Sequence, residues 1–327
     1  MGRNLQNKVV LHIGIDDIDS PLGGCTTHLA SILVESLDGR FSFKDYPNLI
    51  RLNPNIPWKT RGNGAVALRV LVEEDSVSQV VERVLDTVGG YVEEFMHPKR
   101  NPCVAFYTSN NVSRSLRWFG VKAIRDVITL DLVKKVVGRN GVKFECYEPG
   151  LRGLVGAVAA IGVPLDDCDY TYELLAYRCR ENWGKTRLVE DESVFKMDEE
   201  TRPHTFLNVD WEEKRVLITP RGVDPVLYGI RGEDPGILIK AMKMVKIGEP
   251  IERWTIFRSN QGTDMHLQRV PAISSIRVYQ SVIVRGKVVS KPMWIKGGHV
   301  VFRIGDETGT IDAVSYTHLT LPTTERV

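Results

Sequence analysis

The amino-acid sequence predicts an α+β protein of several domains, and three observations support this prediction. Strand-like and helix-like segments alternate over roughly the first half of the chain. From about residue 164 strand-like pieces enclose a single helix, and after residue 275 only short strand-like pieces follow. The 327 residues are enough for two or three separate cores. We therefore expect domains at residues 1–163, 164–270 and 271–314.

The first domain is predicted to begin with a buried strand at residues 9–15, which form an apolar run. An acidic turn and a Pro-Leu-Gly-Gly loop follow, and then a helix that begins at Thr26 or Thr27 and runs to about Leu37. Either threonine fits the N-cap of this helix. The pattern further predicts strands at 65–72 and 101–107 and helices at 76–88, 113–137 and 154–161.

The second domain has the pattern of a ferredoxin-like or related α+β sandwich, because strands are followed by one helix and a return strand. The expected elements are strands at 170–177, 215–218, 226–230 and 253–258 and a helix at 235–245. The third domain shows only about three of the five strands that an OB-fold needs, so we predict a partial OB-fold β-barrel.

The last thirteen residues, 315–327, do not continue the strand pattern. We interpret them as an artefactual tail and exclude them from the fold. On this interpretation, the chain stops inside its third domain.

Composition narrows the class of protein. The longest apolar runs fall short of the roughly 20 residues that a membrane-spanning helix needs, and the polar first residues do not form a secretory leader. The five cysteines are scattered and form no Cys-x-x-Cys pair, so we expect reduced thiols, a cytoplasmic location and no cysteine zinc site. The net charge of +2 neither favours nor excludes a nucleic-acid partner.

The strongest chemical signal lies at residues 14–20, which read Gly-Ile-Asp-Asp-Ile-Asp-Ser. Asp16, Asp17 and Asp19 would repel one another unless a divalent cation neutralised them, and hard cations such as Mg²⁺ prefer oxygen ligands. On a continuing strand Asp17 and Asp19 share one face, with Asp16 on the other, so we expect these two to hold Mg²⁺. The alternative is a solvated acidic turn whose carboxylates cap backbone donors.

Groups suited to phosphate surround this acidic turn. Gly23 and Gly24 lead into a helix N-terminus, which attracts phosphate, and Thr27 lies beside it. Thr26 is either a helix cap or a hydroxyl that accepts a phosphoryl group from ATP. A loop with two prolines and several donors follows at residues 51–64, and we expect its Lys59, Arg61 and Asn63 to bind the ATP phosphates or an RNA backbone.

Carboxylates near the ends of later strands are candidates for binding a guanidinium group. Asp210, Glu233 and Asp264 each follow or interrupt a strand-like piece, and a carboxylate can receive a guanidinium through two hydrogen bonds. A carboxylate in such a position is more often an ordinary surface residue.

Six segments in order resemble the archaeal tRNA(Ile) 2-agmatinylcytidine synthetases, the TiaS family. They read Gly-Ile-Asp-Asp-Ile-Asp-Ser, Gly-Cys-Thr-Thr-His-Leu-Ala, Arg-Leu-Asn-Pro-Asn-Ile-Pro-Trp-Lys-Thr-Arg-Gly-Asn-Gly-Ala, Gly-Leu-Arg-Gly-Leu-Val-Gly-Ala, Val-Leu-Tyr-Gly-Ile-Arg-Gly-Glu and Thr-Asp-Met-His. The resemblance runs from about residue 14 to residue 306.

This resemblance implies a kinase-like α/β catalytic domain, a ferredoxin-like domain, an OB-fold and a C-terminal zinc ribbon. It implies that ATP activates C2 of the wobble cytidine of a minor isoleucine tRNA and that agmatine then displaces the phosphate. The products are 2-agmatinylcytidine, AMP and phosphate, and codon reading changes from AUG to AUA.

The resemblance also assigns roles to residues. The catalytic aspartates of the family fall on Asp16, Asp17 and Asp19, and its autophosphorylated threonine falls on Thr26. Agmatine binding is assigned to Tyr228, Gly229, Glu233 and Asp264. The sequence departs from the family in carrying Ile18 in place of a threonine and in lacking the rest of the OB-fold and the zinc ribbon.

Two other functions compete with the ligase. Residues 17–20 imitate the Asp-x-Asp motif of haloacid-dehalogenase-type phosphohydrolases, in which Asp17 would be the nucleophile. The downstream lysine and acidic pair of that family have no convincing place in this sequence. A non-catalytic OB-fold RNA-binding protein is the third possibility, but it gives the acidic turn no purpose.

Overall fold

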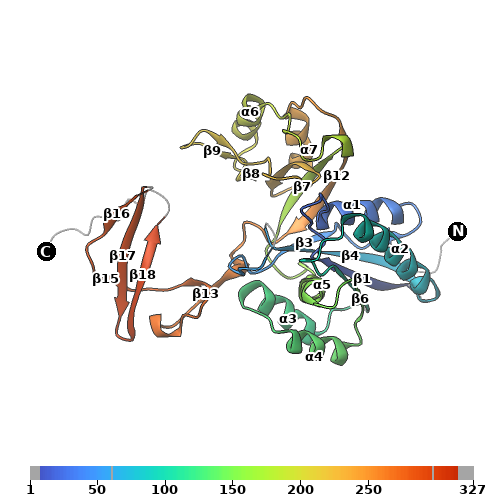
Figure 1. The fold of residues 1–327 in the computed structure, drawn as a ribbon, viewed down its shortest axis with the longest axis horizontal. Coiled ribbons are helices and arrows are strands. Elements are labelled where there is room, and N and C mark those ends of the chain that lie inside the picture. The colour runs from blue at the N-terminus through green and yellow to red at the C-terminus, as the bar shows by residue number, and fades with distance from the viewer. Residues whose placement is uncertain (1–7, 60–61, 297, 316–327) are drawn as a thin grey trace. The chain divides into compact units, whose positions relative to one another are not determined.

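The computed structural model describes residues 8–59, 62–296 and 298–315 of the chain (Figure 1). It forms two compact units, Met1–Met265 and His266–Val327. The larger unit is built on one ten-stranded sheet with helices on both faces. This sheet runs through residue 163, where the sequence predicts the first domain boundary.

The first half of the larger unit alternates strands and helices, as the sequence predicts. Its elements are β1 (Lys8–Asp16), α1 (Thr26–Leu37), β2 (Ser42–Phe43), β3 (Asn48–Arg51), β4 (Gly64–Glu73), a 3₁₀ helix (Glu74–Ser76), α2 (Val77–Phe95), β5 (Cys103–Thr108), α3 (Arg114–Arg125), α4 (Leu130–Asn140), β6 (Lys143–Cys146) and α5 (Arg152–Gly162). Its strands are ordered β6-β5-β1-β4-β3, and β2 pairs with β4.

The alternation of side chains along β1 divides the core in two. Leu11, Ile13 and Ile15 point into a cluster with α1 and α2 on one face of the sheet. The intervening positions, Gly14 and Asp16, face α5 on the other side, where α3 and α4 complete a second cluster. Figure 1 shows these two helical layers on opposite sides of β1 and β4. The acidic strand end therefore lies beside α5.

The second half of the unit continues the same sheet with β7 (Thr171–Arg178), a 3₁₀ helix (Arg180–Asn182), α6 (Asp191–Thr201), β8 (Thr205–Phe206), β9 (Val209–Asp210), β10 (Arg215–Val216), β11 (Val226–Gly232), α7 (Pro235–Met244) and β12 (Ile251–Ser259). Its four main strands are antiparallel and ordered β12-β7-β11-β8. The order of elements is β-α-β-β-α-β. A separate cluster of apolar side chains lies beneath α6 and α7.

The two halves join where β3 and β12 run parallel over two residue pairs, Asn48 with Arg258 and Leu49 with Ser259. Buried charges reinforce this short junction. Arg69 of β4 donates two hydrogen bonds to Asp166, at 2.6 and 2.7 Å, and one to Asp45. Arg258 of β12 donates to the second oxygen of Asp45 at 2.7 Å. The four charges thus connect both halves of the sheet.

Most predicted elements of the larger unit are confirmed within a few residues, but three expectations were wrong. The helix predicted at 113–137 is two helices, because α3 ends at Arg125 and Thr129 caps a new helix. The sequence pattern also missed α6 (Asp191–Thr201), whose composition is largely acidic. The N-cap of α1 is Cys25 rather than Thr26 or Thr27.

The expectation that every cysteine is a free thiol was also wrong. Cys103 and Cys146 form a disulfide, while Cys25, Cys168 and Cys179 are free. The two bonded cysteines are 43 residues apart, but β5 and β6 pair antiparallel and place them directly opposite each other. Sequence spacing alone conceals this proximity.

The smaller unit is described separately. It contains β13 (Leu267–Arg269), a 3₁₀ helix (Ile273–Ser275), β14 (Ser281–Ile283), β15 (Lys287–Val288), β16 (Met293–Ile295), β17 (His299–Asp306) and β18 (Gly309–Ser315). A 3₁₀ helix at Asp264–His266 precedes them. β15, β16 and β18 each pair antiparallel with β17, and β13 pairs with β14.

The OB-fold assignment stays a prediction for this four-stranded sheet. β18 ends at Ser315, the first residue of the predicted artefactual tail, and residues 316–327 lie outside the described residues. Over the described ranges, no helix is both long enough and apolar enough to cross a membrane.

Replacing Arg69 by Met should lower the free energy of unfolding by about 3 kcal/mol, because Asp45 and Asp166 would lose a buried cation. This estimate is at the lower end of the range of roughly 3–5 kcal/mol for broken buried pairs, since Asp166 is partly exposed and Arg258 remains. Urea unfolding measures the change. The matched control is Arg117→Met, whose ion pair with Asp167 is exposed and should be worth less than about 1 kcal/mol. Equal losses in the two variants would contradict the role of the network.

Candidate functional site

The acidic turn begins where β1 ends, at Asp16. Asp17 has a positive φ of 58°, so the chain leaves the extended conformation at this residue. The expectation that Asp17 and Asp19 share a face of a continuing strand was therefore wrong. The reversal directs Asp16 and Asp17 into one pocket and Asp19 into another.

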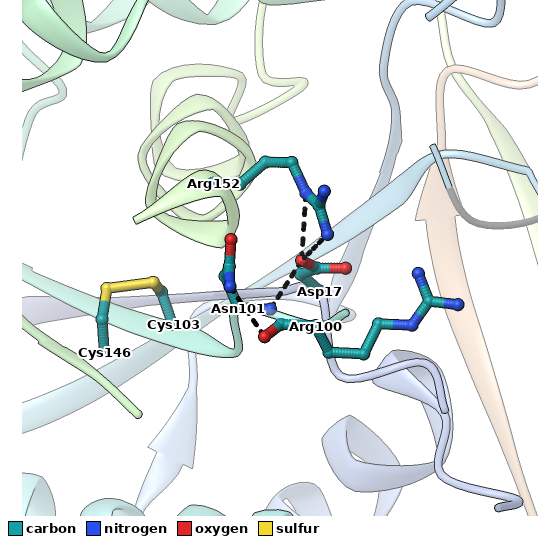
Figure 2. The surroundings of a disulfide bond; sticks show 6 residues. All are labelled: Asp17, Arg100, Asn101, Cys103, Cys146 and Arg152. Carbon is teal, nitrogen blue, oxygen red and sulfur yellow. Dashed lines mark hydrogen bonds and ion pairs between the residues drawn. A yellow bond between two sulfur atoms is a disulfide. The ribbon is translucent and has the colours of Figure 1, made fainter. Parts of the chain in front are cut away.

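Asp17 is buried and held by two separate segments (Figure 2). Its Oδ2 accepts hydrogen bonds from the Asn101 backbone N–H at 2.9 Å and from Nη2 of Arg152 at 2.9 Å. The same Arg152 nitrogen donates to the backbone carbonyl of Lys99 at 2.8 Å. These donors fix one carboxylate oxygen of Asp17 and compensate its burial.

We name the first pocket the Asp17 pocket; its volume is about 430 Å³. One part is apolar and the other carries charged and amide groups. Its lining comprises Asp16, Asp17, Leu52, Ile56, Trp58, Lys59, Asn63, Asn101, Ala123, Asp126, Val127, Ile128, Leu130, Gly150, Arg152, Val155 and Gly156. An apolar wall facing a few convergent polar groups is typical of a small-molecule site.

The Asp16 carboxylate lies in a cramped position between β1 and α5. A Cβ added at Gly156 would lie 1.9 Å from Asp16 Oδ2, so only glycine lets α5 pass this close. Burial and the neighbouring Asp17 raise the pKa of Asp16 well above its ordinary value. A cation in this pocket would offset the cost of placing two carboxylates side by side.

The other carboxylate of the turn, Asp19, serves the start of α1. Its Oδ1 accepts a hydrogen bond from the Thr26 backbone N–H at 2.9 Å and lies 3.4 Å from the Thr26 hydroxyl. This bond supplies the cap that the sequence assigns to a threonine. Thr26 is consequently the first residue of the helix, with its hydroxyl beside a carboxylate.

We name the second pocket the Thr26 pocket; its volume is about 270 Å³. Both halves of the sheet contribute to its lining, which comprises Asp19, Cys25, Thr26, Thr27, Leu49, Arg51, Gly62, Gly64, Glu173, Leu175, Leu217, Ile218, Pro220, Asp224, Val226, Gly229 and Arg231. Carboxylates from three segments, Asp19, Glu173 and Asp224, therefore meet at one small cavity.

Glu173 on β7 is buried at the base of the Thr26 pocket. Burial alone would raise the pKa of Glu173, but Arg51, Arg231 and the Ser259 hydroxyl outweigh it and lower the pKa to about 2. Arg51 donates to both carboxylate oxygens, and Ser259 donates at 2.6 Å. Glu173 is thus a permanently charged anchor that links β3, β7 and β12.

A chain of hydrogen bonds supports α1 from behind. The Cys25 backbone N–H donates to the Tyr91 hydroxyl at 3.1 Å, and this hydroxyl lies 2.9 Å from Nδ1 of His28. Burial lowers the pKa of His28 to about 4, so the ring is neutral at pH 7. Tyr91 can then donate to Nδ1, and Nε2 of His28 can donate to Glu252 on β12, 3.3 Å away. The start of α1 is thereby connected to the second half of the unit.

The structure divides the sequence-predicted site residues into three groups. The Asp17 pocket contains Asp16, Asp17, Lys59 and Asn63, and the Thr26 pocket contains Asp19, Thr26, Thr27 and Gly229. The remaining predicted residues described in the structure line neither pocket; they are Gly23, Gly24, Tyr228, Glu233 and Asp264. Arg61 lies outside the described residues.

Tyr228 is buried in the core below α7, and burial raises its pKa to about 12. Glu233 and Asp264 are exposed. The assignment of agmatine binding to these three residues stays a prediction.

Sequence reasoning missed a charged residue in each pocket, Arg152 in the Asp17 pocket and Glu173 in the Thr26 pocket. Arg152 and Glu173 lie 135 and 122 residues from their partners Asp17 and Arg51. The one local signal for Glu173 is a carboxylate directly before the apolar run of β7. In the ranges 8–59, 62–296 and 298–315, no three or more His, Cys, Asp or Glu side chains are grouped to hold a metal ion. A cation would need ligands from a substrate as well.

These observations define a class of protein: a mixed α+β protein with one large sheet and a pocket on each side of an acidic turn. The family model for the TiaS TCKD domain matches residues 12–148, and that for the TiaS FLD domain matches residues 152–266.

Comparison with known proteins identifies the family. The isoleucine-tRNA 2-agmatinylcytidine synthetase TiaS of Staphylothermus marinus is 46% identical over 315 residues, which cover 94% of this chain and 68% of that protein. A crystal structure of apo TiaS has a TM-score of 0.85 at 40% identity, covering 94% of this chain and 71% of that chain. A crystal structure of TiaS with its isoleucine tRNA, AMPCPP and agmatine has a TM-score of 0.84 at 40% identity, with coverages of 94% and 73%. The chain belongs to the TiaS family.

Replacing Asp16 by Asn should raise the free energy of unfolding at pH 7, measured with a chelator present. The raised pKa of Asp16 means that the ionised carboxylate is disfavoured in the folded state. Protonated Asp16 therefore stabilises the folded protein at acid pH, and this contribution is lost as the pH rises through the pKa of the folded state. The gain should disappear below about pH 4, where Asp16 is protonated in both states.

The matched change in the same turn is Asp17→Asn, which should lower stability at pH 7 because the ion pair with Arg152 is lost. Urea unfolding at pH 4 and pH 7 measures both variants. A loss of stability in both at pH 7 would show that Asp16 is not destabilised by burial.

Proposed function

We propose that this protein is an ATP-dependent ligase that attaches agmatine to C2 of the wobble cytidine of a minor isoleucine tRNA. The observation that carries this proposal is the pair of pockets on either side of the acidic turn, in a chain whose relatives bear the name of that synthetase. A carbonyl oxygen is a poor leaving group. ATP has to convert it into a phosphate ester before an amine can displace it.

ATP suits the Asp17 pocket. The apolar wall of Ile56, Ile128 and Val155 offers a place for the base, and Lys59 and Arg152 offer positive charge for the phosphates. The pocket volume of about 430 Å³ lies within the usual range of roughly 300–1,000 Å³ for ligand sites. A solved TiaS complex that contains AMPCPP supports the same class of ligand.

Mg²⁺ fits the carboxylates of the same pocket, because this ion binds through one or two carboxylates together with substrate phosphates. Asp16 and Asp17 line the pocket together, whereas Asp19, the second ligand expected from the sequence, lines the Thr26 pocket. We therefore propose Asp16 and Asp17 as the ligands. When bound, Mg²⁺ would neutralise charge that develops on the transferred phosphoryl group.

Thr26 is placed to accept a phosphoryl group. Its hydroxyl is 3.4 Å from Asp19 Oδ1, close enough for this carboxylate to take the hydroxyl proton as the oxygen attacks the γ-phosphorus of ATP and the nucleoside diphosphate leaves. The Thr26 pocket suits agmatine, because carboxylates of Asp19 and Asp224 can receive its guanidinium. Gly229, which the sequence assigns to agmatine, lies on the wall of this pocket.

The domain assignments are part of the proposal. The β-α-β-β-α-β order of β7 to β12 supports a ferredoxin-like domain at about residues 164–270. We assign residues 1–163 to the ATP-binding catalytic domain and 271–314 to a partial OB-fold. A cytoplasmic location follows from the tRNA substrate.

The tRNA partner agrees with a basic face of the larger unit. Residues 114–143, which span α3 and α4, contain eight Lys and Arg residues and two Asp residues. Residues 73–97, which span α2 on the opposite face of the sheet, contain seven Asp and Glu residues and one Arg. The α3–α4 connection also lines the Asp17 pocket with Asp126, Val127 and Ile128. An RNA backbone lying across α3 and α4 would thus reach the rim of this pocket.

Incubation with ATP, agmatine and a minor isoleucine tRNA transcript should raise the mass of the wobble cytidine by one agmatine less one water. Mass spectrometry of the digested tRNA measures this change, and omission of ATP or agmatine is the control.

Asp19→Asn should slow the reaction by about 100-fold or more, because the proton acceptor for Thr26 is lost. Label from γ-labelled ATP should appear on Thr26; label on Asp17 would favour a phosphohydrolase.

Charge reversal at two exposed residues of α4, Lys134→Glu and Lys135→Glu, should weaken tRNA binding while ATP turnover without tRNA stays unchanged. The salt dependence of binding should also fall, by about one unit of slope for each lysine–phosphate interaction that the change removes. Filter binding at several salt concentrations measures both effects. Arg83→Glu on the acidic face is the matched control and should leave tRNA affinity unchanged. Equal weakening by the control would argue against α3 and α4 as the docking face.

A further inference from the structure

The disulfide lies beside the acidic turn, although no step of the proposed reaction uses it. Cys103 and Cys146 are the last residue pair of the β5–β6 ladder. β6 is a four-residue strand at the edge of the sheet, and three of its four residues are exposed. A short exposed edge strand has few contacts of its own to hold it. The disulfide is therefore a major constraint on β6.

Each cysteine lies close in sequence to a residue that holds Asp17. Asn101, two residues before Cys103, donates its backbone N–H to Asp17 Oδ2 at 2.9 Å. Arg152, six residues after Cys146, donates to the same oxygen at 2.9 Å. Figure 2 shows Asn101 and Arg152 beside Asp17, with the disulfide to one side of Asn101. The disulfide is therefore a covalent link between the two segments whose residues donate to Asp17.

The two segments also touch each other directly. A Cβ added at Gly153 would lie 2.3 Å from the Asn101 carbonyl oxygen and 3.1 Å from Asp17 Cβ. The Tyr147 N–H donates to the Pro102 carbonyl at 3.0 Å. These contacts are non-covalent, and the disulfide adds a covalent link between the same two segments. A small change of spacing would rotate the carboxylate that both donors hold.

We propose that the Cys103–Cys146 disulfide is a positioning element of the catalytic site, which keeps Asp17 aimed into the Asp17 pocket through Asn101 and Arg152. The effect on catalysis rests on the proposed function, whereas the effect on the Asn101 hydrogen bond does not. Both cysteines act through Asp17 and touch no reacting atom. The bond also makes the site sensitive to reduction.

Reduction by a dithiol such as dithiothreitol breaks one S–S bond and forms two thiols. The dithiol supplies two electrons and two protons and is itself oxidised to a cyclic disulfide. Cys103 is fully buried and Cys146 is partly exposed, so attack should occur at the Cys146 sulfur. Oxidation with oxidised dithiothreitol or glutathione restores the bond.

The test compares the oxidised and reduced forms of the whole chain. Reduction should lower kcat for ATP turnover by about three- to tenfold, since loss of orientation at a reacting group lowers the rate. The KM for agmatine should change less than about twofold. The reason is that we place agmatine in the Thr26 pocket, which lies on the other side of the turn from Asp17. Cys103→Ala/Cys146→Ala should match the reduced protein and should not respond to dithiothreitol. Cys168→Ser, which changes an exposed free cysteine, should behave as the unaltered protein.

A second measurement does not depend on activity. Hydrogen exchange of the Asn101 backbone N–H, followed by NMR, reports the hydrogen bond to Asp17. Reduction should speed this exchange several-fold while the N–H groups within β1 and β4 are unchanged.

The effects of reduction and of Arg152→Lys on kcat should also be less than additive, because both act on the same carboxylate.

The outcomes separate the two proposals. Unchanged Asn101 exchange on reduction would overturn the positioning role, whether or not the rate falls. Faster exchange with an unchanged kcat would also overturn it. Faster exchange in a protein that lacks ATP-dependent ligation in both redox states would support the effect on Asp17 and reject the proposed function.

Discussion

The Thr26 pocket depends on a short junction between the halves of the larger unit, where β3 and β12 share two residue pairs. Glu173 stabilises this junction in one particular register. A buried carboxylate is costly unless every oxygen is paired, and Glu173 finds its partners Arg51, Arg231 and Ser259 only when the strands are in place. The net stability gained is small, but a misplaced register would leave an unpaired buried charge. Because the Thr26 pocket draws its walls from both halves, Glu173 is as much a requirement for the site as the acidic turn.

The second constraint is the reversal of the chain at Asp17. A positive φ at a residue other than glycine costs of the order of 1 kcal/mol or more, and the donors Arg152 and Asn101 offset this cost. The turn separates carboxylates that follow one another in sequence. Asp16 and Asp17 serve one pocket, and Asp19 holds Thr26 at the boundary of the other. The two pockets therefore open on two sides of a single turn, as the proposed binding of a nucleotide and a second substrate requires.

The sequence predicted what local pattern controls. The buried strand β1, the helix α1 and the helix α7 follow from periodicity and turn residues. The acidic turn, a local cluster of carboxylates, was also recognised. The missed features join distant residues: Arg152 with Asp17, Glu173 with Arg51, and Cys103 with Cys146. The cap of α1 was assigned to a threonine because the true acceptor, a carboxylate seven residues earlier, comes near only after the chain reverses.

Net charge shows the same limit of local reasoning. The value of +2 for the whole chain is uninformative, because a strongly basic α3–α4 region and a strongly acidic α2 region cancel within that sum. The sheet separates the two, so they do not neutralise each other. A polyanion is attracted to one face and repelled from the other, which orients it before any specific contact forms. Because the α3–α4 connection borders the Asp17 pocket, this orientation brings an RNA to the side on which we place the phosphates. The fold thus converts a nearly neutral composition into a directed approach.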